Sequence, residues 1–293
     1  MENQPTLFDL PPESTREKEF KQLRNPIWTE NKAKLIECYL YYFVLITKHG
    51  TYIDGFSGPQ EPDKPGMWSA KLVLESKPRW FKNFYLFEKD PTQISKLEAL
   101  KTEIVNESDP RLKRKIEIYP GDFNELIPNV LATNPIREKE ATFCLLDQRT
   151  FECHWNSLIT LAGYKKNGFK IELFYFLTAA WLDRSIAAVK NEMILENWWG
   201  NSGWSALRGM KNCKRAKFVA SRIKDELHYE SVVPWPIYSR EDRGRVMYYM
   251  IHATDHPIAP GLMHRAYHKA LSPKESPEQF ELEFAEWKGE RSQ

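Results

Sequence analysis

The chain has 293 residues, of which 42% are hydrophobic, 13% aromatic and 28% charged, and this composition excludes a largely disordered protein. Its formal net charge of +2 gives no overall electrostatic argument for nucleic-acid binding, so such a role would have to rest on a local basic patch. The four cysteines form no C-x-x-C pair, which argues against a zinc ribbon or a disulfide framework. No apolar run approaches the ~20 residues of a membrane span. We therefore expect a cytoplasmic protein.

Residues 1–25 are polar and interrupted by proline, and we expect them to form a flexible tail. Within this tail, the segment Gln4-Pro5-Thr6-Leu7-Phe8 resembles the Q-x-x-L-F peptide with which bacterial DNA-processing proteins bind the replication sliding clamp. Such peptides begin with glutamine, here Gln4, and insert two apolar anchors, here Leu7 and Phe8, into a groove of the partner. The alternative is a short apolar stretch without a partner, because a five-residue match often arises by chance.

A regular alternation of helices and strands begins near residue 29. The expected helices are 32–47, 68–76, 92–105, 123–131 and 155–164, and the expected strands are 52–54, 84–87, 116–119, 142–146 and 171–177. The run 142–146 is wholly apolar, which is typical of a strand buried on both faces. The alternation therefore predicts an α/β fold with a doubly wound, mostly parallel sheet that binds its ligands at the carboxyl ends of the strands.

The alternation stops after Trp181, where the sequence becomes helical, basic and rich in tryptophan. We expect a core at 26–182, a helical insertion at 183–230, a hairpin and helix completing the core at 231–272, and an acidic tail at 273–293. The two β-runs of the hairpin, 232–238 and 245–253, are joined by a short polar loop that contains glycine. A parallel sheet closed by an antiparallel C-terminal hairpin is characteristic of the Rossmann-like class I S-adenosylmethionine-dependent methyltransferases.

The loop after the first expected strand, in the segment TYIDGFSGPQ (residues 51–60), contains two glycines with two residues between them. A dinucleotide site would need a third glycine and a direct run into a helix, and the loop has neither. It instead resembles the D-x-F-x-G-x-G first motif of DNA-type methyltransferases, with Gln60 in place of the last glycine. The resemblance implies that four residues lie against the methionine half of S-adenosylmethionine: Asp54, Gly55, Phe56 and Gly58. The alternative is a tight turn without a ligand.

Acidic residues also follow the second and third expected strands. Glu88 ends the second strand, where a carboxylate accepts hydrogen bonds from ribose hydroxyls. Asp90 is the next choice, although it precedes Pro91 and caps a helix in the alternative interpretation. Asp122 follows the third strand, where an acid commonly contacts the adenine amino group, and it is equally well placed as a helix N-cap. Acids after three successive strands together predict an S-adenosylmethionine pocket.

The fourth expected strand is followed by the polar segment LDQRTFECHW (residues 146–155). The [DN]-P-P-[YFW] motif of amino-methylating enzymes and the Pro-Cys nucleophile of cytosine-C5 enzymes are both absent from it. Asp147, Gln148 and Arg149 supply an acceptor, an amide and a cation at the expected mouth of the site, and Asp147 is suited to accept a hydrogen bond from a target amine. Cys153 is a candidate nucleophile and His154 a candidate base, and the alternative for this pair is a helix start with a buried thiol.

The insertion combines tryptophans with a series of cations. Aromatic rings stack on bases and cations neutralise phosphates, which makes this segment a candidate nucleic-acid surface. The candidate residues are Trp204, Arg208, Lys211, Lys214 and Arg215. The alternative is a packed aromatic cap with a solvated basic face. The histidines are too scattered to indicate a metal site, and we expect none.

Several segments together resemble the three-Cys-motif partner family (TcmP), over about residues 26–272. They are W28-T29-x-x-K32, Y52-I-D-G-F-S-G-P59, L146-D-Q-R-T-F-E-C-x-W155, L173-F-Y-F176 with W181-L-D-R184, and M247-Y-Y-M-I251. The family name refers to a genomic partner with three cysteines, akin to radical S-adenosylmethionine iron–sulfur enzymes. The resemblance implies a bacterial methyltransferase-like protein, often encoded near mobile or phage-associated genes, and it implies no particular substrate.

The leading hypothesis is an S-adenosylmethionine-dependent methyltransferase-like protein that acts on nucleic acid in a repair, defence or mobile-element context with an iron–sulfur partner. A second hypothesis is a non-catalytic partner subunit of the same fold, which the missing glycine and the missing Pro-Pro motif favour. A third is a metal-dependent nuclease that uses Asp147, Glu152 and His154.

Overall fold

A computed structural model describes residues 27–59, 65–107, 113–239 and 244–271. The proposed clamp peptide, with Gln4, Leu7 and Phe8, lies outside the described residues, and so does Gln60. The described elements follow in the order α1 (Ile27–Thr47), β1 (Gly50–Asp54), η1 (Pro65–Met67), α2 (Ser69–Glu75), β2 (Phe81–Glu88), α3 (Pro91–Glu107), β3 (Lys115–Pro120), α4 (Phe123–Ala132), β4 (Thr142–Leu146), α5 (Trp155–Gly163), β5 (Glu172–Thr178), α6 (Leu182–Ala188), α7 (Glu192–Trp199), η3 (Ser202–Leu207), α8 (Asn212–Leu227), β6 (Ser231–Tyr238), β7 (Val246–Thr254) and α9 (Ala259–Leu271).

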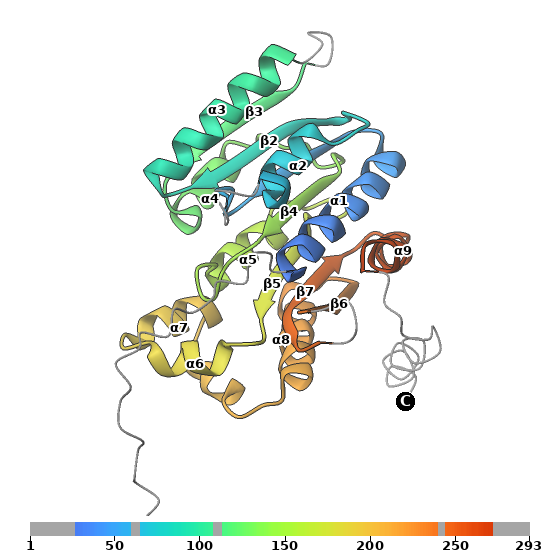
Figure 1. The fold of residues 1–293 in the computed structure, drawn as a ribbon. Coiled ribbons are helices and arrows are strands. Elements are labelled where there is room, and N and C mark those ends of the chain that lie inside the picture. The colour runs from blue at the N-terminus through green and yellow to red at the C-terminus, as the bar shows by residue number, and fades with distance from the viewer. Residues whose placement is uncertain (1–26, 60–64, 108–112, 240–243, 272–293) are drawn as a thin grey trace, which may run out of the picture.

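The strands form one seven-stranded sheet in the order β3-β2-β1-β4-β5-β7-β6 (Figure 1). β1 to β5 pair in parallel, whereas β7 pairs antiparallel with both β5 and β6. The predicted α/β fold with a mostly parallel sheet is therefore confirmed. The central strands β4 and β5 are buried along their whole length, in agreement with their apolar sequences TFCLL and ELFYFLT.

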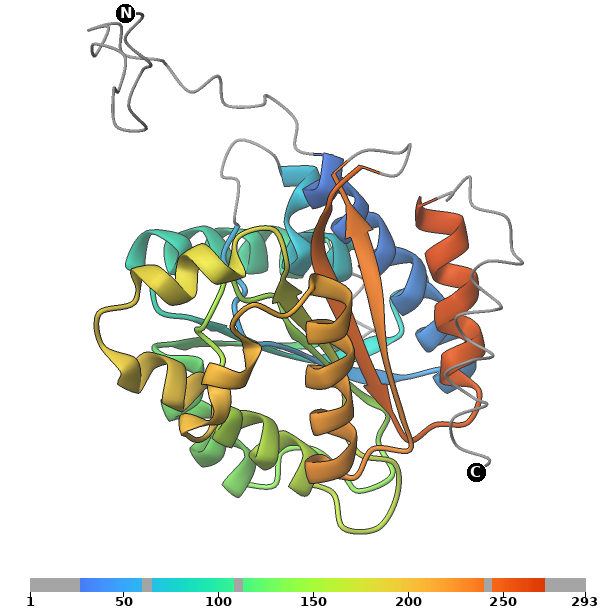
Figure 2. The ribbon, with the colours of Figure 1, turned by 90° about the horizontal axis from the view of Figure 1, so that it is seen from below.

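Helices cover both faces of the sheet and produce two hydrophobic cores. One face packs against α1, α2, α3 and α9, and its core contains Tyr39, Phe84 and Phe174. The other face packs against α4, α5, α7 and α8, and its core contains Trp155, Trp198 and Ile223. Figures 1 and 2 show α1 and α9 on the opposite side of the sheet from α8. Within the described ranges, every helix is too short or too polar to span a bilayer.

The strand order places a crossover point between β1 and β4, because β2 and β3 extend the sheet in one direction and β4 and β5 in the other. Loops that leave the carboxyl ends of β1 and β4 therefore diverge and open a crevice, which is the usual ligand position in such sheets. The cofactor-binding and catalytic residues proposed from the sequence lie in the loops after β1, β2, β3 and β4. Because these strands are parallel, the fold brings the four loops to one edge of the sheet.

Candidate functional site

The loop after β1 is built around the carboxylate of Asp54, whose side chain is buried. The Tyr52 hydroxyl donates to Oδ2 of Asp54 at 2.9 Å, and the backbone N–H of Phe56 donates to Oδ1 at 3.1 Å. The Ser57 hydroxyl donates to the backbone carbonyl of Asp54 at 2.9 Å. Asp54 therefore fixes the first turn of the loop from inside the protein.

Gly55 and Phe56 attach this turn to neighbouring elements. The Gly55 N–H donates to the carbonyl of Leu145 on β4 at 3.0 Å. The Phe56 ring lies against Phe123 at the start of α4, with 5.8 Å between ring centroids. Both residues thus hold the loop over the carboxyl ends of the strands.

Burial raises the pKa of Asp54 to about 7, and the two hydrogen bonds to its carboxylate oppose this rise only in part. The folded state therefore binds a proton more tightly than the unfolded state, and the contribution of Asp54 to stability falls as the pH rises from about 4 to about 7. We expect Asp54→Asn to stabilise the protein relative to wild type at pH 8, by up to about 4 kcal/mol, and much less at pH 5. Urea unfolding at the two pH values tests this, and an equal difference at both would contradict it.

Gly58 brings the same loop into contact with the end of β2. Its N–H donates to Oε2 of Glu88 at 2.8 Å. A Cβ at position 58 would lie 2.4 Å from that oxygen and 2.8 Å from Cβ of Gln93, so only glycine allows this approach. The other carboxylate oxygen of Glu88 accepts from the N–H groups of Lys89 and Asp90, at 2.9 and 3.0 Å. Asp54 and Glu88 are thereby joined through the backbone of one loop.

Asp122 has the role of a helix cap. It precedes α4 and accepts from the N–H of Asn124 at 2.8 Å. Asn124 in turn accepts from the His154 N–H and from the Ser157 hydroxyl, both at 2.8 Å, and connects the third loop to the fourth. The side chain of Asp122 is 35% exposed, and its Oδ2 lies 3.9 Å from Nζ of Lys89, the residue that follows Glu88.

Asp147 follows β4 and forms a buried ion pair with Lys32 of α1, with 2.6 Å between Nζ and Oδ1. The Lys32 ammonium also lies over the rings of Phe176 and Tyr248, at 5.0 and 4.9 Å from their centroids. In the sequence, Lys32 stands out only as part of the W28-T29-x-x-K32 motif, which indicates no chemistry for it. Because 115 residues separate Lys32 from Asp147, no local sequence pattern indicates that they form an ion pair.

Gln148 and Cys153, two of the predicted catalytic residues, are both buried in the loop after β4. Gln148 is buried, donates to the Phe176 carbonyl at 3.3 Å and accepts from the Cys153 N–H at 2.9 Å, so it holds the loop together. The Cys153 thiol is fully buried, and burial raises its pKa far above the usual value, which contradicts a role as nucleophile. The alternative, a helix start with a buried thiol, is correct.

Arg149 and His154 remain at the surface of the same loop. Arg149 is exposed, and His154 is half-buried and directly precedes α5. Since Cys153 is inaccessible, His154 has no adjacent thiol to deprotonate as a base. In the described residues, no group of three or more His, Cys, Asp or Glu side chains is arranged to hold a metal ion, and this gives the nuclease hypothesis no support.

A small cleft lies between the β1 loop and α2. Its lining residues are Phe56, Ser57, Gly58, Met67, Trp68, Ser69 and Asp147, and its volume is about 10 Å³. The Trp68 indole N–H donates to the Ser57 carbonyl at 2.6 Å. Trp68 therefore closes the cleft in this conformation, and Asp147 is the predicted catalytic residue that lines it.

The predicted nucleic-acid-binding residues of the insertion fall into a buried group and an exposed group. Trp204 and Arg215 are buried, which contradicts their role in stacking on bases or binding phosphate. Arg215 donates to the Leu207 carbonyl and forms an ion pair with Asp183 at 2.5 Å. The exposed group is Arg208, Lys211 and Lys214. The insertion is thus a packed aromatic cap with a basic outer face, as in the alternative interpretation.

Comparisons with known proteins add little to this geometry. No model of a known protein family matches the chain, and no curated protein matches it. Among solved structures, it is similar to protein LPL1258 of Legionella pneumophila, which is described under the family model DUF519. The two sequences are 12% identical, the match covers 84% of this chain and 93% of that chain, and the TM-score is 0.44. A similarity at this level carries no inference about function.

Proposed function

We propose that the chain is an S-adenosylmethionine-binding protein of the class I methyltransferase type. The observation that carries the proposal is the sheet, in which five parallel strands are followed by β7 and β6 in antiparallel pairing. A parallel sheet closed in this way is characteristic of that enzyme group. The acids at the ends of β1, β2 and β3 support the proposal, because they lie at the edge where such folds bind their ligand.

The residues at this edge suit the proposed ligand chemically. Glu88 accepts backbone hydrogen bonds on both oxygens and retains lone pairs for ribose hydroxyls, since a carboxylate has about four acceptor positions. The Oδ2 of Asp122 pairs with the exposed Lys89 ammonium at 3.9 Å and retains a lone pair for an amino group. The volume of about 10 Å³ does not suit a nucleoside, so Trp68 and Met67 would have to move for the ligand to enter.

When bound, S-adenosylmethionine supplies a methyl group that leaves by displacement at its sulfonium. The chain's own contribution would be to orient the acceptor. Asp147 lines the cleft, and its carboxylate would accept a hydrogen bond from an amine, while Lys32 supplies the counter-charge. Nucleic acid is the proposed acceptor, with Arg208, Lys211 and Lys214 available to phosphates on the exposed face of the insertion.

A non-catalytic partner subunit is the second candidate function. The observations that favour it are the closed cleft and the burial of Asp147, of whose side chain only 7% is exposed. In this role the fold would serve as a scaffold for other proteins. A three-Cys iron–sulfur protein and the sliding clamp remain the proposed partners, the latter through the Gln4–Phe8 peptide.

Titration calorimetry with S-adenosylhomocysteine tests the proposal. We expect the wild-type protein to bind, and Glu88→Gln to bind about 10- to 100-fold more weakly, because a neutral amide loses a charge-assisted hydrogen bond to ribose. The glutamine oxygen can accept either from Gly58 or from Lys89 and Asp90, so a circular dichroism melt establishes that the variant is folded before it is titrated. Glu103→Gln is the matched control, because Glu103 is an exposed acid of α3 with no proposed role, and the affinity of this variant should be unchanged. Absence of wild-type binding would overturn the proposal and favour the non-catalytic subunit.

A further inference from the structure

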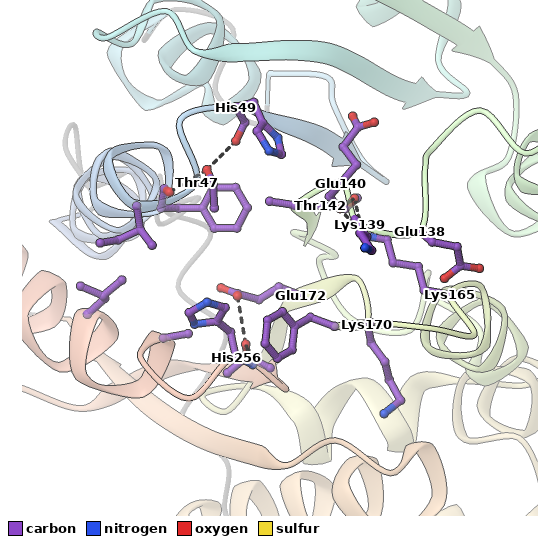
Figure 3. A pocket seen from close by; sticks show the side chains of 18 of the residues that line it. Thr47, His49, Glu138, Lys139, Glu140, Thr142, Lys165, Lys170, Glu172 and His256 are labelled. Atoms are coloured by element: carbon purple, nitrogen blue, oxygen red, sulfur yellow. Dashed lines mark hydrogen bonds between the residues drawn. The ribbon is translucent and has the colours of Figure 1, made fainter.

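A larger cavity lies at the opposite edge of the sheet, at the amino ends of β4 and β5. Its volume is about 400 Å³, within the range of small-molecule sites. It is bounded by the end of α1, the starts of β4 and β5, the end of β7 and the start of α9 (Figure 3). The proposed function uses none of the residues that line this cavity.

The walls of this cavity are largely apolar. They are formed by Tyr39, Phe43 and Ile46 of α1, by Phe169 and by Leu262 of α9. Ile46 and Phe169 are 48% and 51% exposed, although large apolar side chains are usually covered. An apolar ligand body would cover both of these side chains and gain the free energy of removing them from water.

Lys165 enters the cavity from the segment after α5, and only 6% of its surface is exposed. Its ammonium donates to the Glu140 carbonyl and, at 3.0 Å, to the Thr142 hydroxyl. Neither partner carries a charge, and an ammonium has three donors. Burial lowers the pKa of Lys165 to about 8, which reflects the cost of holding this cation away from water. The carboxylates of Glu140 and Glu138 partly offset this cost, and an anionic ligand group in contact with the ammonium would offset more of it.

The carboxylates around the cavity are already engaged by donors from the protein. Glu172 accepts from the Tyr39 hydroxyl and, at 3.0 Å, from the Thr254 hydroxyl, and it contacts His252 Nε2 at 2.9 Å. Glu138 turns away from the cavity in Figure 3 and accepts from the N–H groups of Lys166 and Asn167. The Glu140 carboxylate accepts from Thr51 and Asn83. Glu138 and Glu140 act on Lys165 electrostatically, but within the described residues its ammonium donates only to the Glu140 carbonyl and the Thr142 hydroxyl, which leaves one donor for a ligand.

A basic groove of about 610 Å³ adjoins the cavity and shares His49, Lys139 and Glu140 with it. Its other cationic lining residues are Lys82, Lys113 and Arg137. Four lysine and arginine side chains face a single carboxylate in this groove, so the potential near the cavity favours an anion over a cation.

We propose that this cavity binds an apolar carboxylate of the size of a medium-chain fatty acid. The carboxylate group would pair with Lys165, and the hydrocarbon body would pack against Phe43, Ile46 and Leu262. The site is separate from the proposed S-adenosylmethionine cleft, which lies at the other ends of the same strands.

Titration calorimetry with decanoate, below its micelle concentration, tests the proposal. We expect wild-type protein to bind decanoate at least tenfold more tightly than decanol or decylammonium, which have the same hydrocarbon body. Lys165→Met should weaken decanoate binding at least tenfold, because it keeps the stem and removes the charge. The adjacent exposed Lys166→Met is the matched control and should bind as wild type.

A second variant, Leu262→Trp, fills the cavity from α9 and should abolish decanoate binding while leaving Lys165 in place. Circular dichroism melts of all three variants establish that each is folded at the titration temperature. Failure of wild type to bind decanoate, equal binding of decylammonium, or full binding by a folded Lys165→Met variant would each overturn the proposal. Binding of S-adenosylhomocysteine is unaffected by these outcomes, so this test and that of the proposed function fail independently.

Discussion

Replacement of Lys32 by methionine is expected to lower the free energy of unfolding by about 3–5 kcal/mol, because it leaves a carboxylate buried without its counter-ion. The side chains of Lys32 and Asp147 are only 4% and 7% exposed, so water cannot replace the lost partner without disrupting the packing. The variant also loses the contacts of the ammonium with the Phe176 and Tyr248 rings. Urea unfolding followed by tryptophan fluorescence measures the change.

Two further variants distinguish this effect from simple loss of a lysine. Lys34→Met removes a half-exposed lysine of the same helix, which pairs with Glu30, and should change stability by less than about 1 kcal/mol. The double variant Lys32→Met/Asp147→Leu replaces both charges by apolar groups and should recover at least half of the loss. A Lys32→Met protein as stable as Lys34→Met would show that the pair is not important for folding.

Arg215→Met is expected to lower the free energy of unfolding by about 2–3 kcal/mol. Only 1% of the Arg215 side chain is exposed, and its guanidinium donates twice to the carbonyl of the buried Leu207 and once to the side chain of Asn212. Methionine cannot donate, so the Leu207 carbonyl would lose both hydrogen bonds from Arg215 and keep only the long one, 3.4 Å, from the Met210 N–H. The loss of the Asp183 ion pair adds less, because Asp183 is 61% exposed.

Lys214→Met tests the contrast between this buried cation and its exposed neighbour. It should leave stability within about 0.5 kcal/mol of wild type. If the outer face binds nucleic acid, it should also weaken the affinity for a fluorescent oligonucleotide in an anisotropy titration at low salt. A folded Arg215→Met protein should retain that affinity. If Arg215→Met bound the oligonucleotide weakly but kept the free energy of unfolding of the wild type, the structural role of Arg215 would be contradicted.

The elements of the core could be predicted closely because their signals are local. Strand β4 coincides with its apolar run, and α3 begins at Pro91, where the missing N–H has no intrahelical partner to lose. The position of Asp122 as an N-cap was likewise one of the two predicted alternatives. Each of these features depends on a few neighbouring residues, and the sequence displays them directly.

The chemistry of the site could be predicted only in part, because burial and pairing depend on distant residues. Cys153 and Arg215 have the side chains of reactive or binding residues, yet the helices packed over them remove both from solvent. Lys32 gains its role only because α1 crosses the end of β4. The cavity around Lys165 is formed by segments between residues 39 and 262, and no single stretch of sequence indicates it.

The position of β7 between β5 and β6 also affects how the chain can assemble on the ribosome. Strands β1 to β5 are complete once residue 178 has been synthesised, but β5 keeps one unpaired edge until residues 246–254 emerge. That edge belongs to the apolar strand ELFYFLT, which is the kind of segment that pairs with other chains when exposed. The nascent protein therefore passes through a period in which one edge of this largely apolar strand is open to aggregation, and this period ends when β7 pairs with it.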